Sequence, residues 1–264
     1  MEPSAQAEES RVLKCLSNRH VLRQMRLMLI VAHPDDEVIG AGARLPELRS
    51  SMFIHVTTGA AARCAGVASR RSSELSAALG LAGLSNSQLH PVGLPDQSLS
   101  RMLLGLTKEF RSKIAAQKPD AILTHPYEGG HPDHDAIAFA VHCACRATAH
   151  PPPIVEMAFY HQGPHGIRTG EFLPDGNVPI LSLSLSTSER DLKRSLLDCF
   201  PSQTLMLRHF QLKTEKFRIA PAYDFTLPPH TGRLFYENFD WGIRSGLEWR
   251  ALAHEALWQL EMES

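Results

Sequence analysis

The sequence alternates short apolar runs with amphipathic stretches, and this rhythm restricts its fold more than any other feature. Apolar runs too short for helices indicate strands that are buried on both faces. Strands are expected at 28–32, 53–57, 88–94, 121–124 and 154–160. Helical spacing of apolar residues separates them, at 38–49, 69–82, 99–117 and 133–145. The pattern predicts an α/β fold in which helices cover both faces of a mostly parallel sheet.

Length and composition narrow the functional classes. A chain of 264 residues is expected to form a single domain, residues 1–264. Its 27 Lys and Arg against 28 Asp and Glu give a net charge of −1, which argues against nucleic acid or an anionic membrane surface as a partner. No signal peptide or membrane span is recognisable, and five cysteines without a CxxC pair suit a reduced chain, so we expect a cytoplasmic protein. The oligomeric state stays open.

The two ends of the chain are less regular than its middle. We expect residues 1–24 to be frayed, with a short helix or connecting segment toward their end. Ser188 begins a capping-box-like pattern, which predicts a helix ending near Phe200. Residues 221–249 are rich in Pro, Gly and aromatic residues and are expected to form an ordered, lid-like cover, with core packing as the alternative. A last helix is expected at 249–260.

Two histidine-rich segments follow strands of the predicted sheet. Ala32-His-Pro-Asp-Asp-Glu37 comes directly after the first strand, and His131-Pro-Asp-His134 lies where a loop enters a helix. Ligands bind at the carboxyl ends of strands in such sheets, and catalytic zinc keeps three protein ligands and one open position. A His and a carboxylate from one loop with a His from the other would make such a site. One of the adjacent carboxylates could then hold metal while its neighbour accepts a proton.

Each segment alone has a simpler explanation, since HPDH is also a common capped helix start and either Asp could cap the helix that follows. Their joint placement at the ends of two strands favours the metal site. Other signatures are missing from the sequence. Gly40 and Gly42 lack the third glycine of a dinucleotide fingerprint, because Leu45 stands in its place, and there is no GxSxG elbow.

These motifs resemble the LmbE/PIG-L family of zinc-dependent N-acetylglucosaminyl deacetylases. The resemblance covers roughly residues 27–203 and includes further motifs at 71–74, 93–96 and 202–203, although Thr58-Gly59 departs from the family pattern. It implies a Rossmann-like sheet and hydrolysis of an N-acetyl group. By motif position it implies the following roles: zinc ligands His33, Asp36 and His134; general base Asp35; and His131, oriented by Asp133, for the oxyanion or the leaving amine.

Four further residues are candidates for binding the substrate. Arg71 and Glu74 share a helix face, where a surface ion pair is the alternative, and their family position favours substrate contact. Asp96 could accept hydrogen bonds from sugar hydroxyls, and Tyr127 could donate to the oxyanion. A turn Asp or a loop Tyr at these positions also occurs without any functional reason. We expect His125, which directly follows the predicted strand at 121–124, to have a structural role.

The expected function is metal-dependent deacetylation of a small N-acetylated amino sugar or sugar conjugate. A zinc-bound water would attack the acetamide carbonyl with Asp35 as base, and Fe2+ could replace Zn2+ at a His-Asp-His site. One alternative is an amidase that acts on a larger sugar or thiol conjugate. Another is a non-catalytic carbohydrate-binding protein on the same fold, although binding alone needs no basic carboxylate beside an open metal site.

Overall fold

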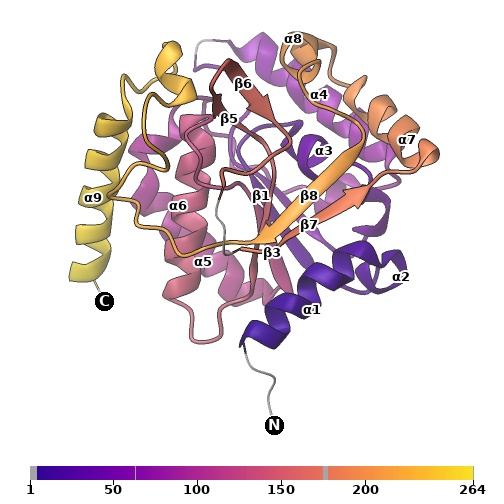
Figure 1. The fold of residues 1–264 in the computed structure, drawn as a ribbon, viewed down its shortest axis with the longest axis horizontal. Helices are drawn as coiled ribbons and strands as arrows, with labels where there is room; N and C mark the ends of the chain where they lie inside the picture. Colours follow the sequence, from indigo (N-terminus) through magenta and orange to yellow (C-terminus); the bar gives the residue numbers. More distant parts are fainter. Residues whose placement is uncertain (1–4, 63, 175–177, 264) are drawn as a thin grey trace.

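A six-stranded sheet forms the centre of the computed structural model, which describes residues 5–62, 64–174 and 178–263 (Figure 1). The strand order is β2-β1-β3-β4-β8-β7, with the first four strands parallel and the last two antiparallel. A separate hairpin pairs β5 with β6. The strand bounds are β1 Leu27–Val31, β2 Met52–His55, β3 Ala121–Thr124, β4 Ile154–Met157, β5 Tyr160–Gly163, β6 Gly166–Thr169, β7 Ile180–Ser184 and β8 Thr214–Ile219.

Helices cover both faces of the sheet, as the sequence predicts. Leu27 and Leu29 of β1 pack in one cluster with α1, α4 and α7, whereas Met28 and Ile30 pack in the other with α5, α6 and α9. Figure 1 shows these two helical layers on opposite sides of the sheet. The α-helices are α1 Ala5–Ser17, α2 Arg19–Leu22, α3 Asp36–Ala41, α4 Ala65–Leu81, α5 Leu103–Gln117, α6 Pro132–Arg146, α7 Thr187–Leu197, α8 Thr204–Leu207 and α9 Gly246–Met262.

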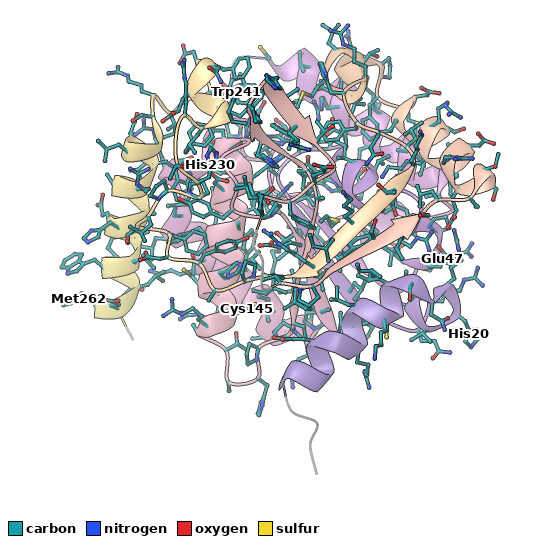
Figure 2. The ribbon with its side chains drawn as sticks, viewed as in Figure 1. His20, Glu47, Cys145, His230, Trp241 and Met262 are labelled. Atoms are coloured by element: carbon teal, nitrogen blue, oxygen red, sulfur yellow. The ribbon has the colours of Figure 1, made fainter. Side chains whose placement is uncertain are left out.

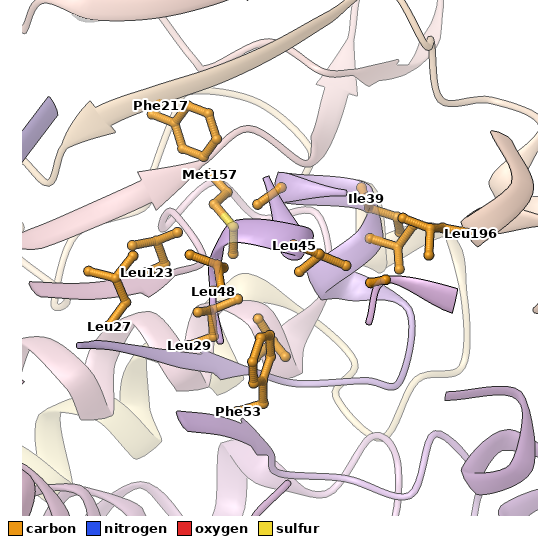
Figure 3. Packing of buried hydrophobic residues seen from close by; sticks show 14 of the residues in the cluster. Leu27, Leu29, Ile39, Leu45, Leu48, Phe53, Leu123, Met157, Leu196 and Phe217 are labelled. Carbon is orange, nitrogen blue, oxygen red and sulfur yellow. The ribbon is translucent and has the colours of Figure 1, made fainter. Parts of the chain in front are cut away.

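The core of the first layer brings together side chains from distant parts of the chain. Figure 3 shows side chains from successive strands along one face of the sheet, with Phe53 of β2 at one end, Leu29 and Leu123 of β1 and β3 between, and Met157 and Phe217 of β4 and β8 at the other end. These side chains are fully buried.

Short 3-10 helices connect the main elements, namely Leu45–Glu47, Asn86–Gln88, Leu99–Arg101, Pro201–Gln203 and Phe235–Asn238. The predicted α/β fold with a mostly parallel sheet is therefore confirmed.

The predicted strand at 88–94 forms only in part. Leu89 and Leu94 make isolated parallel bridges to Phe53 and Thr57, and His90 donates its N–H to the carbonyl of Phe53. The segment thus runs beside β2 without a continuous ladder. The predicted helix at 38–49 is also shorter than expected, because α3 ends at Ala41 and a 3-10 turn follows.

The second half of the chain adds strands that the sequence analysis did not anticipate. β7 and β8 extend the sheet in antiparallel fashion, and the predicted strand at 154–160 divides into β4 and the start of β5. The expected helix at 188–200 is α7, but its capping box is formed by Ser186 with Glu189. This start lies two residues earlier than the one expected at Ser188.

The expectation that residues 1–24 are frayed is corrected over most of that segment. Residues 1–4 lie outside the described part of the chain, but α1 and α2 are helical. Val12, Leu16 and Leu22 are buried in the first core cluster. Apolar residues at this spacing give α1 one face that packs on the sheet, which is why the segment is ordered.

The lid-like interpretation of residues 221–249 is corrected in a similar way. Phe225, Leu234, Tyr236, Ile243 and Trp249 are buried in the second core cluster. The segment is therefore mainly packed against the body of the protein.

Among the described residues, no helix combines the length and the apolar character that crossing a bilayer requires.

Candidate metal centre and active site

The carboxyl ends of two neighbouring strands bring the histidine motifs together. β1 pairs directly with β3, and the loops that follow them carry residues 32–37 and 125–131. His131 is the N-cap of α6, with Pro132 in its first turn, so α6 begins at this edge of the sheet. His125, directly after β3, accepts the Ala32 N–H through Nε2 at 3.0 Å. This bond ties the two loops to each other, in keeping with the structural role expected for His125.

The three predicted metal ligands converge. The His33 Nδ1 atom lies 3.2 Å from His134 Nε2 and 3.4 Å from Asp36 Oδ2, and His134 Nε2 lies 3.4 Å from Asp36 Oδ1. Ligand atoms about 2.0–2.1 Å from a tetrahedral zinc are about 3.3 Å apart. The donor set and its spacing therefore fit Zn2+. Two imidazoles and one carboxylate also suit Fe2+.

The opposite side of the His33 ring is fixed by a carboxylate. His33 Nε2 lies 2.9 Å from Asp96 Oδ1, so Nε2 donates there and leaves Nδ1 free to accept a metal. Burial lowers the pKa of His33, but the charge of Asp96 opposes this effect and raises that pKa well above its ordinary value. Asp96, which we expected to bind substrate, therefore contacts a candidate ligand while it also lines the pocket.

Asp36 is held in its charged form by the imidazoles around it. Burial opposes ionisation, but His134 and His125 hold the pKa of Asp36 well below its usual range. Asp36 Oδ2 also accepts a hydrogen bond from the backbone N–H of His33 at 2.7 Å. Burial lowers the pKa of the neighbouring His125 to about 3.

Asp35 has a different environment and an unusual backbone. Its φ of 124° lies in a region that L-residues rarely adopt. Arg71 holds this turn, since its guanidinium donates to the Pro34 carbonyl and lies 3.2 Å from Asp35 Oδ2. Burial raises the pKa of Asp35 to about 8, and the charge of Arg71 opposes that rise. The two adjacent aspartates are thus directed to different surroundings, as expected.

Asp133 orients His131 through its backbone rather than through its carboxylate. The Asp133 N–H donates to His131 Nδ1 at 3.1 Å. The carboxylate instead accepts the N–H groups of Gln97 and Leu99, at 2.7 and 3.0 Å. Asp133 therefore contacts the His131 ring through its backbone N–H alone. With Nδ1 acting as an acceptor, neutral His131 carries its proton on Nε2.

Two predicted substrate contacts lie outside the pocket. Glu74 accepts the Ser202 N–H at 3.0 Å and the Ser202 hydroxyl at 2.6 Å, so it joins α4 to the 201–203 turn. The Tyr127 hydroxyl donates to the Leu227 carbonyl at 2.9 Å, and its ring packs against Trp249. Glu74 and Tyr127 are thus positioned as structural residues, which corrects both expectations. In each case the distant partner was invisible to local spacing.

A pocket of about 210 Å³ opens beside the metal cluster. Besides the predicted residues it is lined by side chains that the sequence analysis did not place there, namely Ile39, Gln97, Tyr160, Gln203, Met206, Phe210 and Trp241. The motif at 202–203 gave a signal for Gln203, and the aromatic-rich segment 221–249 contains Trp241. No motif in the sequence singled out the other lining residues.

The fold and the site define an α/β protein with a His-Asp-His cluster, and the comparisons with known proteins find a family match and structures with the same fold. Residues 28–145 match the PIG-L family, described as GlcNAc-PI de-N-acetylase. The resemblance to the LmbE/PIG-L family is therefore confirmed over this range, which contains all three candidate ligands. No curated protein matches the sequence significantly.

Solved structures show the same fold at low identity. A deacetylase of the teicoplanin biosynthesis pathway is 19% identical with a TM-score of 0.57, covering 73% of this chain and 96% of that one. The A40926 pseudoaglycone deacetylase is 19% identical with a TM-score of 0.57, covering 76% of this chain and 98% of that one. N,N'-diacetylchitobiose deacetylase from Pyrococcus horikoshii is 18% identical with a TM-score of 0.52, covering 88% of this chain and 98% of that one.

Proposed function

We propose that this protein is a metal-dependent N-deacetylase, a carbon–nitrogen hydrolase that acts on an N-acetylated amino sugar or sugar conjugate. The observation that carries the proposal is the convergence of His33, Asp36 and His134 at zinc-like spacing beside the differently placed Asp35. The family match and the deacetylases among the solved structures support the same reaction class.

In this proposal His33, Asp36 and His134 hold the metal, with Asp96 fixing the ring of His33. A divalent cation bound there supplies a Lewis acid for the acetamide carbonyl and makes water more acidic. The pocket next to the cluster admits the acetamide group. His33 and Asp36 follow β1 and His134 lies in the first turn of α6, which follows β3, so the β1–β3 pairing holds the three together.

Asp35 acts as the general base. Its carboxylate lines the pocket, and it accepts a proton from the water that attacks the acetamide carbon. Arg71 keeps the carboxylate oriented and favours its charged form against the effect of burial. When the carbon–nitrogen bond breaks, the proton passes from Asp35 to the departing amine, and the products are acetate and the free amino sugar.

His131 stabilises the charge that develops on the carbonyl oxygen. The Asp133 N–H occupies Nδ1, which directs the remaining ring proton to Nε2. Burial, together with the neighbouring His33 and His134, holds the pKa of His131 well below its usual value. A neutral imidazole that donates from Nε2 is suited to binding an oxyanion.

Four substitutions test the division of roles. Asp36→Ala and His134→Ala remove ligands and should release most of the zinc on dialysis. Asp35→Asn and His131→Ala should keep about one zinc per chain. Both should lose acetate release, by ~10²–10⁴-fold for the general base. Zinc by atomic absorption and acetate release from N-acetylglucosamine are measured on all four variants and the wild type.

Three outcomes would count against the proposal. Equal zinc retention across the four variants would remove the assigned ligand set. Stoichiometric zinc in the wild type without acetate release from any N-acetylated glycan would favour a carbohydrate-binding protein. Release from large conjugates alone would indicate the amidase alternative.

A further inference from the structure

The C-terminal helix α9 has a second apolar face, which points away from the body of the protein. Trp249 and Ala253 are buried on its inner face, in the second core cluster. On the opposite face, Leu247, Trp258 and Met262 are 70%, 57% and 71% exposed. Figure 1 shows α9 at the outer edge of the molecule, and Figure 2 shows Met262 at that edge near the end of the helix. A helix that only covers a core has a polar outer face, and α9 does not.

The exposed residues of α9 form one stripe along the helix. The stripe consists of Leu247, Ala251, His254, Trp258 and Met262, and four of these five residues are apolar. Successive members are three or four positions apart, which places them on one side of an α-helix. A helix of 17 residues is about 25 Å long, so the stripe extends over nearly all of it. A long apolar row on the surface of a protein indicates a contact surface.

Two charged residues beside the stripe have opposite signs and lie toward opposite ends of the helix. Arg250 and Glu261 are about three helical turns apart, so they share one flank of the stripe. Within the described part of the chain, neither side chain forms an ion pair. The last turn of α9 also has no basic residue, although the carbonyl end of a helix is already negative and favours a cation. Glu261 thus lacks a positive partner in the single chain.

A second copy of α9, packed antiparallel to the first, would match large side chains with small ones. When a two-fold axis passes beside His254, residues equally far from it on opposite sides face each other. Ala251 of one copy then faces Trp258 of the other, and the small side chain leaves room for the indole. Leu247 similarly faces Met262, so apolar side chains meet on both sides of the axis.

The same register also brings opposite charges together. Arg250 of one copy lies beside Glu261 of the other, and the symmetry repeats this contact, so the interface contains two such pairs. The helix dipoles run in opposite directions, so the acidic end of each α9 lies beside the positive end of the other. Near the axis, His254 can donate a hydrogen bond to Glu255 of the second copy. A parallel pair would instead set Arg250 against Arg250 and Glu261 against Glu261.

We propose that the outer face of α9 is the interface of a symmetric homodimer in which the two α9 helices pack antiparallel. One helix face is at the lower end of the size range of specific interfaces, so the dissociation constant should be in the micromolar range. The proposal does not depend on the deacetylase function, because no residue of the stripe lines the pocket beside the metal cluster.

Sedimentation of the full chain at concentrations from about 1 to 300 µM measures the dissociation constant. Leu247→Glu and Trp258→Glu should each raise it about tenfold or more, because a charge enters the apolar contact. Leu205→Glu is the matched control, since Leu205 on α8 is 74% exposed and lies outside the stripe. This control should dimerise as the wild type does. Circular dichroism should show the same helical content and thermal transition in all three variants.

Reversal of the charges tests the antiparallel register. Arg250→Glu or Glu261→Arg alone sets like charges together and should raise the dissociation constant about threefold to tenfold at low salt. The double variant exchanges the two charges, so it should recover the wild-type constant. A parallel pair predicts no such difference between the single and double variants.

A wild-type chain that stays monomeric over the whole concentration range would overturn the inference. A dimer that Leu247→Glu and Trp258→Glu leave intact, or that Leu205→Glu disrupts equally, would overturn it too. Failure of the double charge variant to recover would exclude the antiparallel register. A monomer that binds phosphatidylcholine vesicles, and loses this binding in Trp258→Glu, would show that a lipid surface covers the stripe instead.

Discussion

Arg71 and Gly59 depend on each other at the scale of single residues. Gly59 has a φ of +63°, and a Cβ there would lie 2.6 Å from Arg71 Nε and 3.0 Å from Pro34 Cδ. The guanidinium therefore needs this glycine in order to reach the Pro34 carbonyl and Asp35. The Thr58-Gly59 pair, which departs from the family pattern, keeps the glycine that this contact requires.

Gly59→Ala should consequently lower activity through Arg71. Gly83→Ala is the matched control, because Gly83 also has a positive φ, +74°, but its nearest neighbour is Arg49 at 3.4 Å. Both variants should lose about 1 kcal/mol of unfolding free energy from backbone strain. Only Gly59→Ala should also lose kcat, by about tenfold or more, with zinc content unchanged. Urea unfolding and acetate release measure the two effects, and equal activity in both variants would contradict the role of Arg71.

Among the elements, α7 connects the N-terminal helices to the sheet. Glu189 closes the capping box of α7 by accepting the Ser186 N–H at 2.7 Å, and it pairs with Arg19 at 2.7 Å and with Arg44. Partial burial opposes its ionisation, but the Ser186 N–H and Arg19 lower the pKa of Glu189 to about 2. One carboxylate thus joins α7 to the residues that precede β1 and follow α3.

The stabilisation from Glu189 should depend on pH. Its pKa is lower in the folded state than the ordinary value of 4.5, so the contribution is complete above pH 4.5 and lost as the pH falls toward 2. Glu189→Gln should reduce the unfolding free energy at pH 7 by about 1–2 kcal/mol after allowance for solvent screening, with a smaller difference at pH 3. Urea unfolding at pH 7, 4.5 and 3 measures this.

Glu171→Gln serves as the control, because Glu171 forms an exposed pair with Arg168. Glu171→Gln should change the unfolding free energy by less than about 0.5 kcal/mol at pH 7, 4.5 and 3. A constant difference between Glu189→Gln and the wild type over this range would show that the charge of Glu189 is not what stabilises α7.

At the scale of the whole molecule, the C-terminal segment belongs to the core and also reaches the pocket. Leu234, Tyr236 and Ile243 are each at most 2% exposed, while Trp241 extends to the pocket. The Phe235 N–H donates to the Gly129 carbonyl, which ties this segment to the loop before His131. Site and core are therefore built from the same stretch of chain.

Deletion of residues 228–246 should accordingly unfold the protein. Removing even one buried large apolar side chain typically costs 2–5 kcal/mol, and total stability is typically 5–15 kcal/mol. Circular dichroism and thermal unfolding should show loss of the cooperative transition. Phe239→Ala, at a side chain that is 44% exposed, should keep that transition. A folded deletion variant that retains zinc would restore the interpretation of this segment as a detachable lid.

The sequence by itself determined the parallel part of the sheet and the meeting of the two histidine segments. Buried parallel strands are continuous apolar runs, and the segments that follow adjacent strands must meet at one edge. The resemblance to the family then singled out His33, Asp36 and His134 as candidate ligands. The antiparallel strands β7 and β8 could not, because their half-buried residues alternate within a short, polar stretch.

Only the tertiary structure decided which neighbours each remaining side chain has. Glu74 meets Ser202, the Asp133 carboxylate meets the 97–99 turn, and Tyr127 meets Leu227. These contacts join residues far apart in the chain, and local spacing carries no information about them. Trp241 reaches His131 for the same reason, since packing of the C-terminal segment places it there. Motif spacing can thus indicate the reacting groups, whereas the walls that select a substrate depend on how the whole chain packs.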